Sequence, residues 1–396
     1  MKKKRVKSLR NIVVAAIVVI FAVSLGACGS SGTGTGTGGG SADKTPAPAT
    51  SGGSAPATSG GSSAVGAGMV DTSAFKTDKA TKDIYIGFSE FNTVNTWRVQ
   101  NDREIQYHAQ ELGIKLDTTN ANSDPAKQVS DVQDLLAKGI DALVINAGSP
   151  TAMANAMKQC IAAGVPVILE NSEVDDQTSY TGYVGTKAED FGYTISTWLL
   201  DKLGNKGKIV VVDGIAGNSV SVLRHNGLQK ALDELPDKGA GIEILNTYYG
   251  DWAYDKGKQI GEQMLAAYPQ IDGVWSQGGA MSQGIVEAFQ AANRPLVPIT
   301  GEDSNGFLKM WANLKPQGFT SIAAADPTWQ SAYALDVAMK ALKGEPIKKL
   351  DYIEIPVITD DTLANYVKPN YSDAYWCNTH LPASYADKYY LNNGSN

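Results

Sequence analysis

From Lys82 onward, short apolar segments typical of β-strands alternate with amphipathic segments of helical length. Parallel strands need a crossover connection, usually a helix, so this alternation predicts an α/β fold with helices on both faces of parallel sheets. The ten expected strands are Ile84–Ser89, Ile114–Thr119, Ala142–Asn146, Pro166–Glu170, Thr181–Val184, Lys208–Asp213, Ile242–Thr247, Gly273–Gln277, Pro298–Gly301 and Thr320–Ala323.

One helix is predicted together with both of its ends, over residues 124–138. Asp124 is suited to cap the helix, and Pro125 is suited to its first turn. Gly139 marks the stop. Its apolar face is formed by Val129, Val132, Leu135 and Leu136.

Two sheets are more plausible than one, because ten strands approach the limit of a single strongly twisted open sheet. The segment Gly185-Thr186-Lys187 also interrupts the alternation halfway along the chain. Ligands of open α/β sheets bind outside the carboxyl ends of the strands, and two lobes can turn those ends toward each other across a cleft.

The loops after these strands combine aromatic rings with carboxylate, amide and guanidinium groups, which suits a polyhydroxylated ligand. Rings pack on C–H faces, while charged groups bond to hydroxyls. The alternative is that these residues are only helix caps and rim residues. The candidate ligand-binding residues are Ser89, Asn95, Trp97, Arg98, Glu170, Asn171, Arg224, Trp252 and Asp303.

Other residues of these types are assigned no ligand. Trp198, Trp275 and Trp311 lie inside predicted elements and are expected to pack in the core. The three histidines, His108, His225 and His380, are isolated in sequence, so neither a metal nor another cofactor is expected. The chain also lacks a Gly-x-Ser-x-Gly elbow and a Walker loop, and we therefore expect a binding protein rather than an enzyme.

The N-terminus carries six cations, followed by an apolar run from Ile12 to Leu25 that is too short for an ordinary spanning helix. Its end, Leu25-Gly26-Ala27-Cys28, resembles the lipobox of bacterial lipoproteins. Residues 1–27 are thus predicted to be a signal peptide, with lipid attached to Cys28. The alternative is a secretory signal or an uncleaved anchor with an incidental cysteine.

Residues 28–81 are expected to form a tether, because most of this stretch is Gly, Ser, Thr, Ala and Pro. The net charge of the whole chain is −7, and without the signal it is near −13, which argues against nucleic acid or anionic lipid as a partner. Such a protein would be lipid-anchored on the outer face of the cytoplasmic membrane. Two more cysteines, Cys160 and Cys377, could form a disulfide there, although nothing in the sequence requires it.

From about Lys82 to Val357 the chain resembles the ribose- and galactofuranose-type periplasmic binding proteins, the solute receptors of sugar ABC importers. The segments that carry the resemblance are Gly87-Phe88-Ser89, Thr96-Trp97-Arg98, Asp124-Pro125-Ala126-Lys127-Gln128, Val132-Gln133-Asp134-Leu135, Gly164-Val165-Pro166-Val167-Ile168, Gly214-Ile215-Ala216-Gly217-Asn218-Ser219 and Arg224-x-x-Gly227. The resemblance implies a monomeric trap that delivers a monosaccharide or related polyol to a membrane permease. The alternative is a sensory receptor that presents the ligand to a chemoreceptor or kinase.

The resemblance also implies a type I periplasmic binding protein fold, in which three crossings join two lobes near Thr186, Ala324 and Leu350. Lobe 1 would comprise 82–186 plus 325–350, and lobe 2 would comprise 187–324 plus 351–370. No role is assigned to the aromatic tail, 371–396. Ser89, Asn95, Trp97 and Arg98 match the first-lobe ligand loop of the family, and Arg224, Trp252 and Asp303 match second-lobe positions that hold the sugar.

Several positions depart from the family pattern. Glu170-Asn171 stands where ribose binders place an Asp-Arg pair, and Gly278-Gly279 replaces a polar pair, which implies extra room near Gly278. The usual hinge-side glutamine is absent, with Asp326 nearby. Because Arg98 instead follows the galactofuranose-type pattern, the sugar cannot be named from the resemblance.

Overall fold

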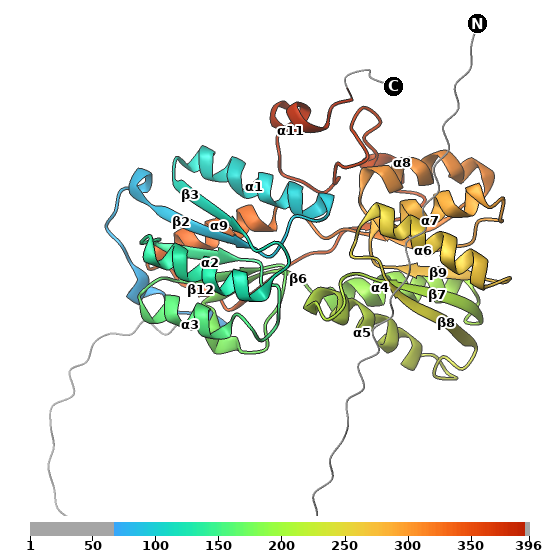
Figure 1. Ribbon diagram of the computed structural model, residues 1–396, viewed down its shortest axis with the longest axis horizontal. Helices are drawn as coiled ribbons and strands as arrows, with labels where there is room; N and C mark the ends of the chain where they lie inside the picture. The colour runs from blue at the N-terminus through green and yellow to red at the C-terminus, as the bar shows by residue number, and fades with distance from the viewer. Residues whose placement is uncertain (1–66, 393–396) are drawn as a thin grey trace, which may run out of the picture. The chain divides into compact units, whose positions relative to one another are not determined.

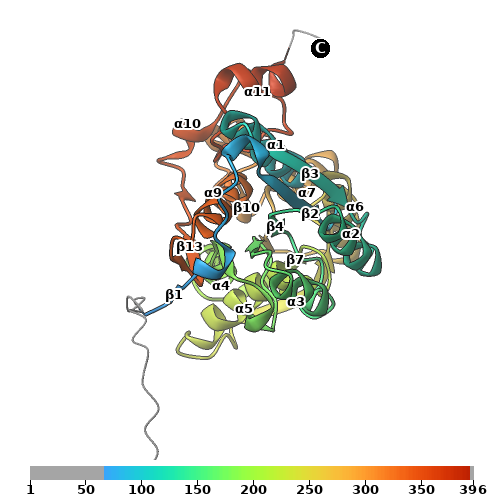
Figure 2. The same ribbon diagram turned by 90° about the vertical axis from the view of Figure 1, so that its left-hand side faces the viewer.

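The computed structural model describes residues 67–392, which contain two six-stranded sheets with helices on both faces (Figures 1 and 2). This confirms the predicted α/β class with two mainly parallel sheets. The predicted signal peptide, Cys28 and most of the predicted tether lie outside the described residues.

The first sheet has the strand order β13-β6-β5-β4-β2-β3, and all its neighbouring strands are parallel. Helices α1 (Thr96–Leu112) and α9 (Gln330–Leu342) pack on one face, and α2 (Pro125–Ala137) and α3 (Ala154–Ala162) pack on the other. The strands are β2 (Tyr85–Glu90), β3 (Lys115–Asn120), β4 (Ala142–Ile145), β5 (Val167–Glu170), β6 (Gly182–Thr186) and β13 (Leu350–Ile353).

The second sheet has the order β14-β11-β10-β9-β7-β8, with only β14 antiparallel to its neighbour. One face is covered by α4 (Ala188–Lys202) and α5 (Ser219–Asp233), and the other by α6 (Tyr254–Ala267), α7 (Gly279–Ala291) and α8 (Asn305–Leu314). The strands are β7 (Gly207–Asp213), β8 (Ile242–Tyr249), β9 (Gly273–Ser276), β10 (Ile299–Glu302), β11 (Ser321–Ala324) and β14 (Val357–Ile358).

All ten predicted strands are confirmed, as are the bounds of the predicted helix. The Asp124 carboxylate accepts hydrogen bonds from the Ala126 and Lys127 amides at 2.8 and 3.3 Å, Pro125 opens the helix, and Gly139 follows it with a φ of +79°. These bounds were predictable because caps and stops act through neighbouring residues.

The chain crosses between the two sheets three times, as the resemblance implied, but the third crossing differs. The first follows Thr186 and the second follows Ala324, whereas the third lies at 354–356 instead of near Leu350. The reason is that β13 pairs with β6 and lengthens the first sheet. Residues 351–353 therefore belong to the first lobe, not to the second as predicted.

The folded body also begins before the predicted boundary at residue 82. Strand β1 (Met69–Val70) pairs with β12 (Ile347–Lys348) in a small antiparallel sheet of its own. The stretch from β1 to β2 also contains two 3-10 helices, Ser73–Phe75 and Thr81–Asp83. The other described 3-10 helices are Gln177–Ser179 and Lys315–Gln317.

The aromatic tail is part of the folded body. After α10 (Leu363–Tyr366) the chain runs to α11 (Ala383–Tyr390), which lies beside α1 in both ribbon views (Figures 1 and 2). The Tyr385 ring packs on Tyr107 of α1, with ring centroids 4.8 Å apart. A tail rich in tyrosine can thus bury its rings against the first lobe.

Cys160 and Cys377 are both free, and Cys160 lies in the first-lobe core. Trp275 and Trp311 are fully buried and Trp198 packs against the second-lobe core, as predicted.

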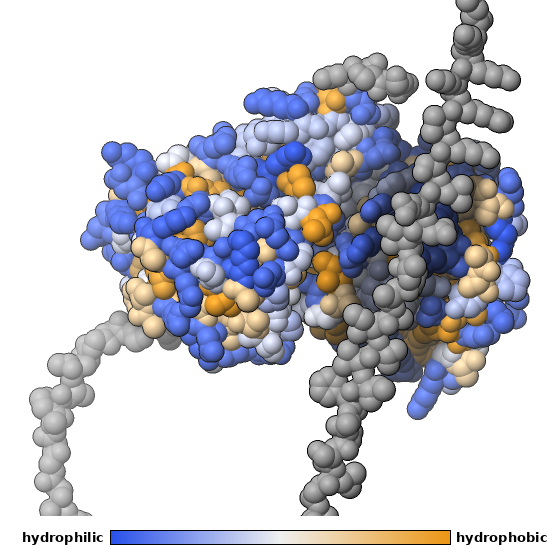
Figure 3. Space-filling view, viewed as in Figure 1, coloured by the Kyte–Doolittle hydropathy of each residue, from blue (hydrophilic) through white to orange (hydrophobic). Residues whose placement is uncertain are grey.

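Residues 67–392 include no group of metal-ligating side chains and no helix long and apolar enough to cross a membrane. The face drawn in Figure 3 is mainly hydrophilic, with apolar side chains in small groups.

Candidate functional site

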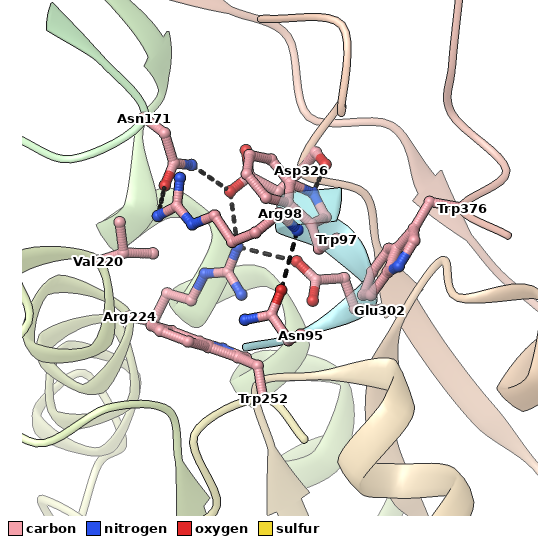
Figure 4. A pocket seen from close by; sticks show the side chains of 10 residues that line it. All are labelled: Asn95, Trp97, Arg98, Asn171, Val220, Arg224, Trp252, Glu302, Asp326 and Trp376. Atoms are coloured by element: carbon pink, nitrogen blue, oxygen red, sulfur yellow. Dashed lines mark hydrogen bonds and ion pairs between the residues drawn. The ribbon is translucent and has the colours of Figure 1, made fainter. Parts of the chain in front are cut away.

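A cavity with an empty volume of about 320 Å³ lies where the carboxyl ends of the two sheets face each other. Its walls combine three indole rings with guanidinium, carboxylate and amide groups (Figure 4). The lining residues are Asn95, Trp97, Arg98, Asn171, Val220, Arg224, Trp252, Glu302, Asp326 and Trp376.

On the first lobe, three of these residues lie at the start of α1, where Asn95 caps the helix. The Asn95 side chain accepts a hydrogen bond from the Arg98 amide at 2.9 Å, which places Trp97 and Arg98 in the first turn. The Trp97 indole donates to the Asp326 carbonyl at 2.7 Å. The Arg98 guanidinium lies over that indole, 4.9 Å from the ring centroid.

Arg98 is held from its other side by the loop after β5. Its guanidinium donates to the Asn171 side chain at 3.0 Å and lies 3.5 Å from the Glu170 carboxylate. Asn171 adopts a left-handed φ of +60°, a conformation that asparagine tolerates better than most residues. Glu170 lies behind Arg98 and does not line the cavity.

On the second lobe, Arg224 of α5 is buried and makes three hydrogen bonds. It donates to the Gln277 carbonyl at 2.7 Å and to the carboxylates of Glu302 and Asp326, both at 2.9 Å. Helix α4 approaches α5 closely at this point, since a Cβ on Gly192 would lie 1.9 Å from the Arg224 carbonyl oxygen. Glycine at this position of α4 therefore allows the close approach of the two helices.

Asp326 connects the two lobes at the second crossing (Figure 4). One carboxylate oxygen accepts from Arg224 of the second lobe and from Asn171 of the first lobe, the latter at 2.9 Å. The other oxygen accepts from Thr186, at the first crossing, and from Gln330 of α9, at 2.9 and 3.1 Å. Since each carboxylate oxygen accepts two bonds, the hydrogen-bonding capacity of this buried group is satisfied.

Trp252 reaches the cavity through a gap that two glycines leave open. A Cβ on Gly214 would lie 2.2 Å from its ring, and one on Gly278 would lie 2.7 Å away. The extra room predicted near Gly278 is therefore absent, because the indole fills it. The Trp252 Nε1 is buried and has no hydrogen-bond partner.

Burial raises the pKa of two glutamates at the cavity, Glu302 in its wall and Glu170 beside Arg98. The pKa of Glu302 rises to about 8, because desolvation outweighs the nearby Arg224 guanidinium. Burial likewise raises the pKa of Glu170 to about 7, with Arg98 opposing the shift. At neutral pH the protonated form of Glu302 is favoured, which adds an O–H donor to the wall of the cavity.

Six of the nine predicted site residues line the cavity: Asn95, Trp97, Arg98, Asn171, Arg224 and Trp252. Ser89, Glu170 and Asp303 do not. Gln128 lies 3.4 Å from the buried Ser89 hydroxyl, and Asp303 accepts the Asn378 amide at 2.7 Å and so holds the tail.

Four lining residues are additional to the predicted set, and two of them had a usable signal. Glu302 is the last residue of β10, and Asp326 follows β11 after one residue, so strand ends could have indicated both. Val220 and Trp376 carried no such signal. Trp376 lies in the tail to which no role was assigned.

Comparison with known proteins identifies the family. The model of the periplasmic binding protein domain matches residues 86–346. The chain belongs to this family. The matched proteins bind solutes and are not enzymes, in agreement with the predicted resemblance. The match ends before Trp376 and the rest of the tail.

Two curated relatives cover most of the chain. The ribose import binding protein of Bacillus subtilis is 26% identical over 268 residues, which is 68% of this chain and 85% of that protein. The xylitol-binding protein of Mycolicibacterium smegmatis is 27% identical over 301 residues, or 76% of this chain and 84% of that protein.

Solved structures share the fold. An ABC transporter solute-binding protein from Mycobacterium smegmatis with bound glycerol is 26% identical with a TM-score of 0.66, covering 72% of this chain and 97% of that one. A galactofuranose-binding protein has a TM-score of 0.65 at 22% identity, covering 71% of this chain and 96% of that one. The second likeness concerns the fold alone.

Proposed function

We propose that this protein captures a monosaccharide or a related polyol in the cavity between its lobes and delivers it to an ABC importer. The observation that carries the proposal is the composition of the cavity: two arginines, two carboxyl groups and two amides lie beside three indoles. Relatives described as ribose import and xylitol-binding proteins support it.

The chemistry of the walls suits such a ligand. Arg98 and Arg224 supply fixed donors, while Asn171 and Glu302 supply acceptors, so adjacent hydroxyls can bond as both donors and acceptors. The faces of Trp97 and Trp252 suit the C–H faces of a sugar ring or polyol chain.

A ligand panel tests the proposal. We expect at least one of D-ribose, D-allose, L-arabinose, D-galactose, D-fructose, xylitol, myo-inositol and glycerol to bind with a Kd of about 1 μM or below. Calorimetry measures the affinity, and tryptophan fluorescence should change because three indoles line the cavity. Maltotriose, a trisaccharide outside the proposed ligand class, is the control. Absence of heat and of thermal stabilisation with all eight compounds would contradict the proposal.

We propose further that Cys28 carries a lipid that anchors the protein to the outer face of the cytoplasmic membrane. The basic start, the short apolar run and the Leu25–Cys28 box support this anchor. Cells that express the full chain should incorporate labelled fatty acid into the wild type and not into Cys28→Ala. Equal labelling of both chains would exclude lipid attachment at Cys28, while sugar binding would be unaffected by either outcome.

A further inference from the structure

The C-terminal segment, residues 367–392, contacts both lobes. It leaves α10 on the second lobe and ends in α11 beside α1 of the first lobe (Figures 1 and 2). The chain therefore spans the two lobes once more after its three crossings, in a part that lies beyond the family match.

Asn305 and Asp303 hold this segment on the second lobe. The buried Asn305 amide group donates to the carbonyls of Lys368, Tyr371 and Ser372 at 2.9, 3.1 and 3.1 Å, and its oxygen accepts the Lys368 amide at 2.9 Å. Asp303 accepts the Asn378 amide at 2.7 Å. Through these bonds, the backbone of the segment is held at the start of α8 on the second lobe.

The first lobe holds the same segment through α1. Gln100, which is fully buried, donates to the Trp376 carbonyl and accepts the Trp376 amide, both at 2.9 Å. The Trp376 indole donates to the Thr96 hydroxyl at 2.9 Å. Further along, Glu104 accepts the His380 amide at 3.2 Å.

The junction of these two sets of bonds places Trp376 in the wall of the cavity. Its side chain is 1% exposed, and it lines the cavity together with Trp97 and Trp252 (Figure 4). Because Gln100 fixes its backbone and Thr96 fixes its indole nitrogen, the ring is held on three atoms. A ligand in the cavity would therefore contact an indole ring whose orientation is already fixed.

Bonds to both lobes within residues 376–378 cannot all survive a separation of the lobes. The second lobe holds the segment by covalent continuity through α10 and by the four Asn305 bonds. The first lobe holds residues 376–390 through the buried Gln100 and through the Trp329 ring, which stacks on His380 with ring centroids 4.2 Å apart. The segment can therefore keep its bonds to both lobes only while the cleft is closed.

We propose that the C-terminal segment is a clasp that bonds to α1 and to the second lobe together when the cleft is closed, and that it places Trp376 against the ligand. The contact with ligand rests on the proposed function, whereas the docking on α1 does not. The chain thus adds to the site an aromatic wall from outside the matched domain.

Substitution of Trp376 tests the contact with ligand. Across the eight compounds of the panel, Trp376→Ala should weaken binding roughly tenfold or more, because an aromatic wall is lost from a closed cavity. Trp376→Phe should retain most of the affinity. Ser384→Ala, at an exposed position of α11 outside the cavity, is the control in the same segment. Wild-type affinity in Trp376→Ala would overturn the contact while leaving sugar binding established.

Hydrogen exchange tests the docking without any ligand. In Gln100→Ala, amides of residues 376–390 should exchange at least about tenfold faster than in the wild type, while those of 367–372 keep their protection. Thr96→Val, which removes only the bond to the indole, gives a milder second variant. Unchanged exchange of 376–390 in Gln100→Ala, with a normal melting temperature, would overturn the clasp even if the panel yields a ligand.

Discussion

Arg224→Ala should weaken ligand binding at least roughly a hundredfold, because the arginine lines the cavity and holds two other lining residues in place. Its loss leaves the buried Asp326 carboxylate without its guanidinium partner and Glu302 without a hydrogen-bond donor. Removing one partner of a buried ion pair costs about 3 kcal/mol of folding free energy. Calorimetry and urea unfolding measure the two effects separately.

Two further variants show whether the loss of binding comes from the charge of Arg224, from its geometry or from any cation on the helix. Arg224→Lys keeps the charge but lacks the planar fork that reaches two carboxyl groups at once, so we expect it to restore stability more than affinity. Lys230→Ala removes an exposed cation of the same helix, paired with Glu189 at the surface, and should leave binding unchanged. Wild-type affinity in Arg224→Ala would remove Arg224 from the site.

Asp326→Asn should destabilise the protein by about 3 kcal/mol, although the two side chains have the same shape. Four donors point at this carboxylate, from Asn171, Thr186, Arg224 and Gln330. An asparagine has only one acceptor oxygen, so its amide group must face at least one donor, and Arg224 loses a buried counter-charge.

Urea unfolding measures this loss, and Asp336→Asn is the control. The half-exposed Asp336 pairs with His108 at the surface, and its substitution should change the free energy of unfolding by about 0.5 kcal/mol or less. If Asp326→Asn costs no more than the control, Asp326 does not join the lobes as its bonds indicate.

The strands and the helix caps were predictable because their signals are local. A buried strand shows as a short apolar run, and Asp124, Pro125 and Gly139 act on residues within one helical turn. The four short strands β1, β12, β13 and β14 were not predicted. Each has two to four residues and exists only because an edge of another strand is available to pair with it.

The candidate site was predictable in part for the same reason. Asn95, Trp97 and Arg98 stand together at a helix start, and Arg224 follows a strand end, so topology alone places them near the cleft. Asp303 lies one residue from Glu302 and is turned to the tail instead of the cavity. Which of two adjacent acids faces a cavity depends on packing that the sequence pattern does not contain.

By itself, the sequence determined the α/β class, the positions of ten strands and the kind of chemistry at their ends, since periodicity, caps and residue types are local properties. Only the tertiary structure decided that Asp326 joins the lobes and that Trp376 closes the cavity. The bond between Asn171 and Asp326 spans 155 positions, and that between Thr96 and Trp376 spans 280. Contacts at such separations arise from how the sheets, crossings and tail pack together, and the residues next to them in the sequence do not predict them.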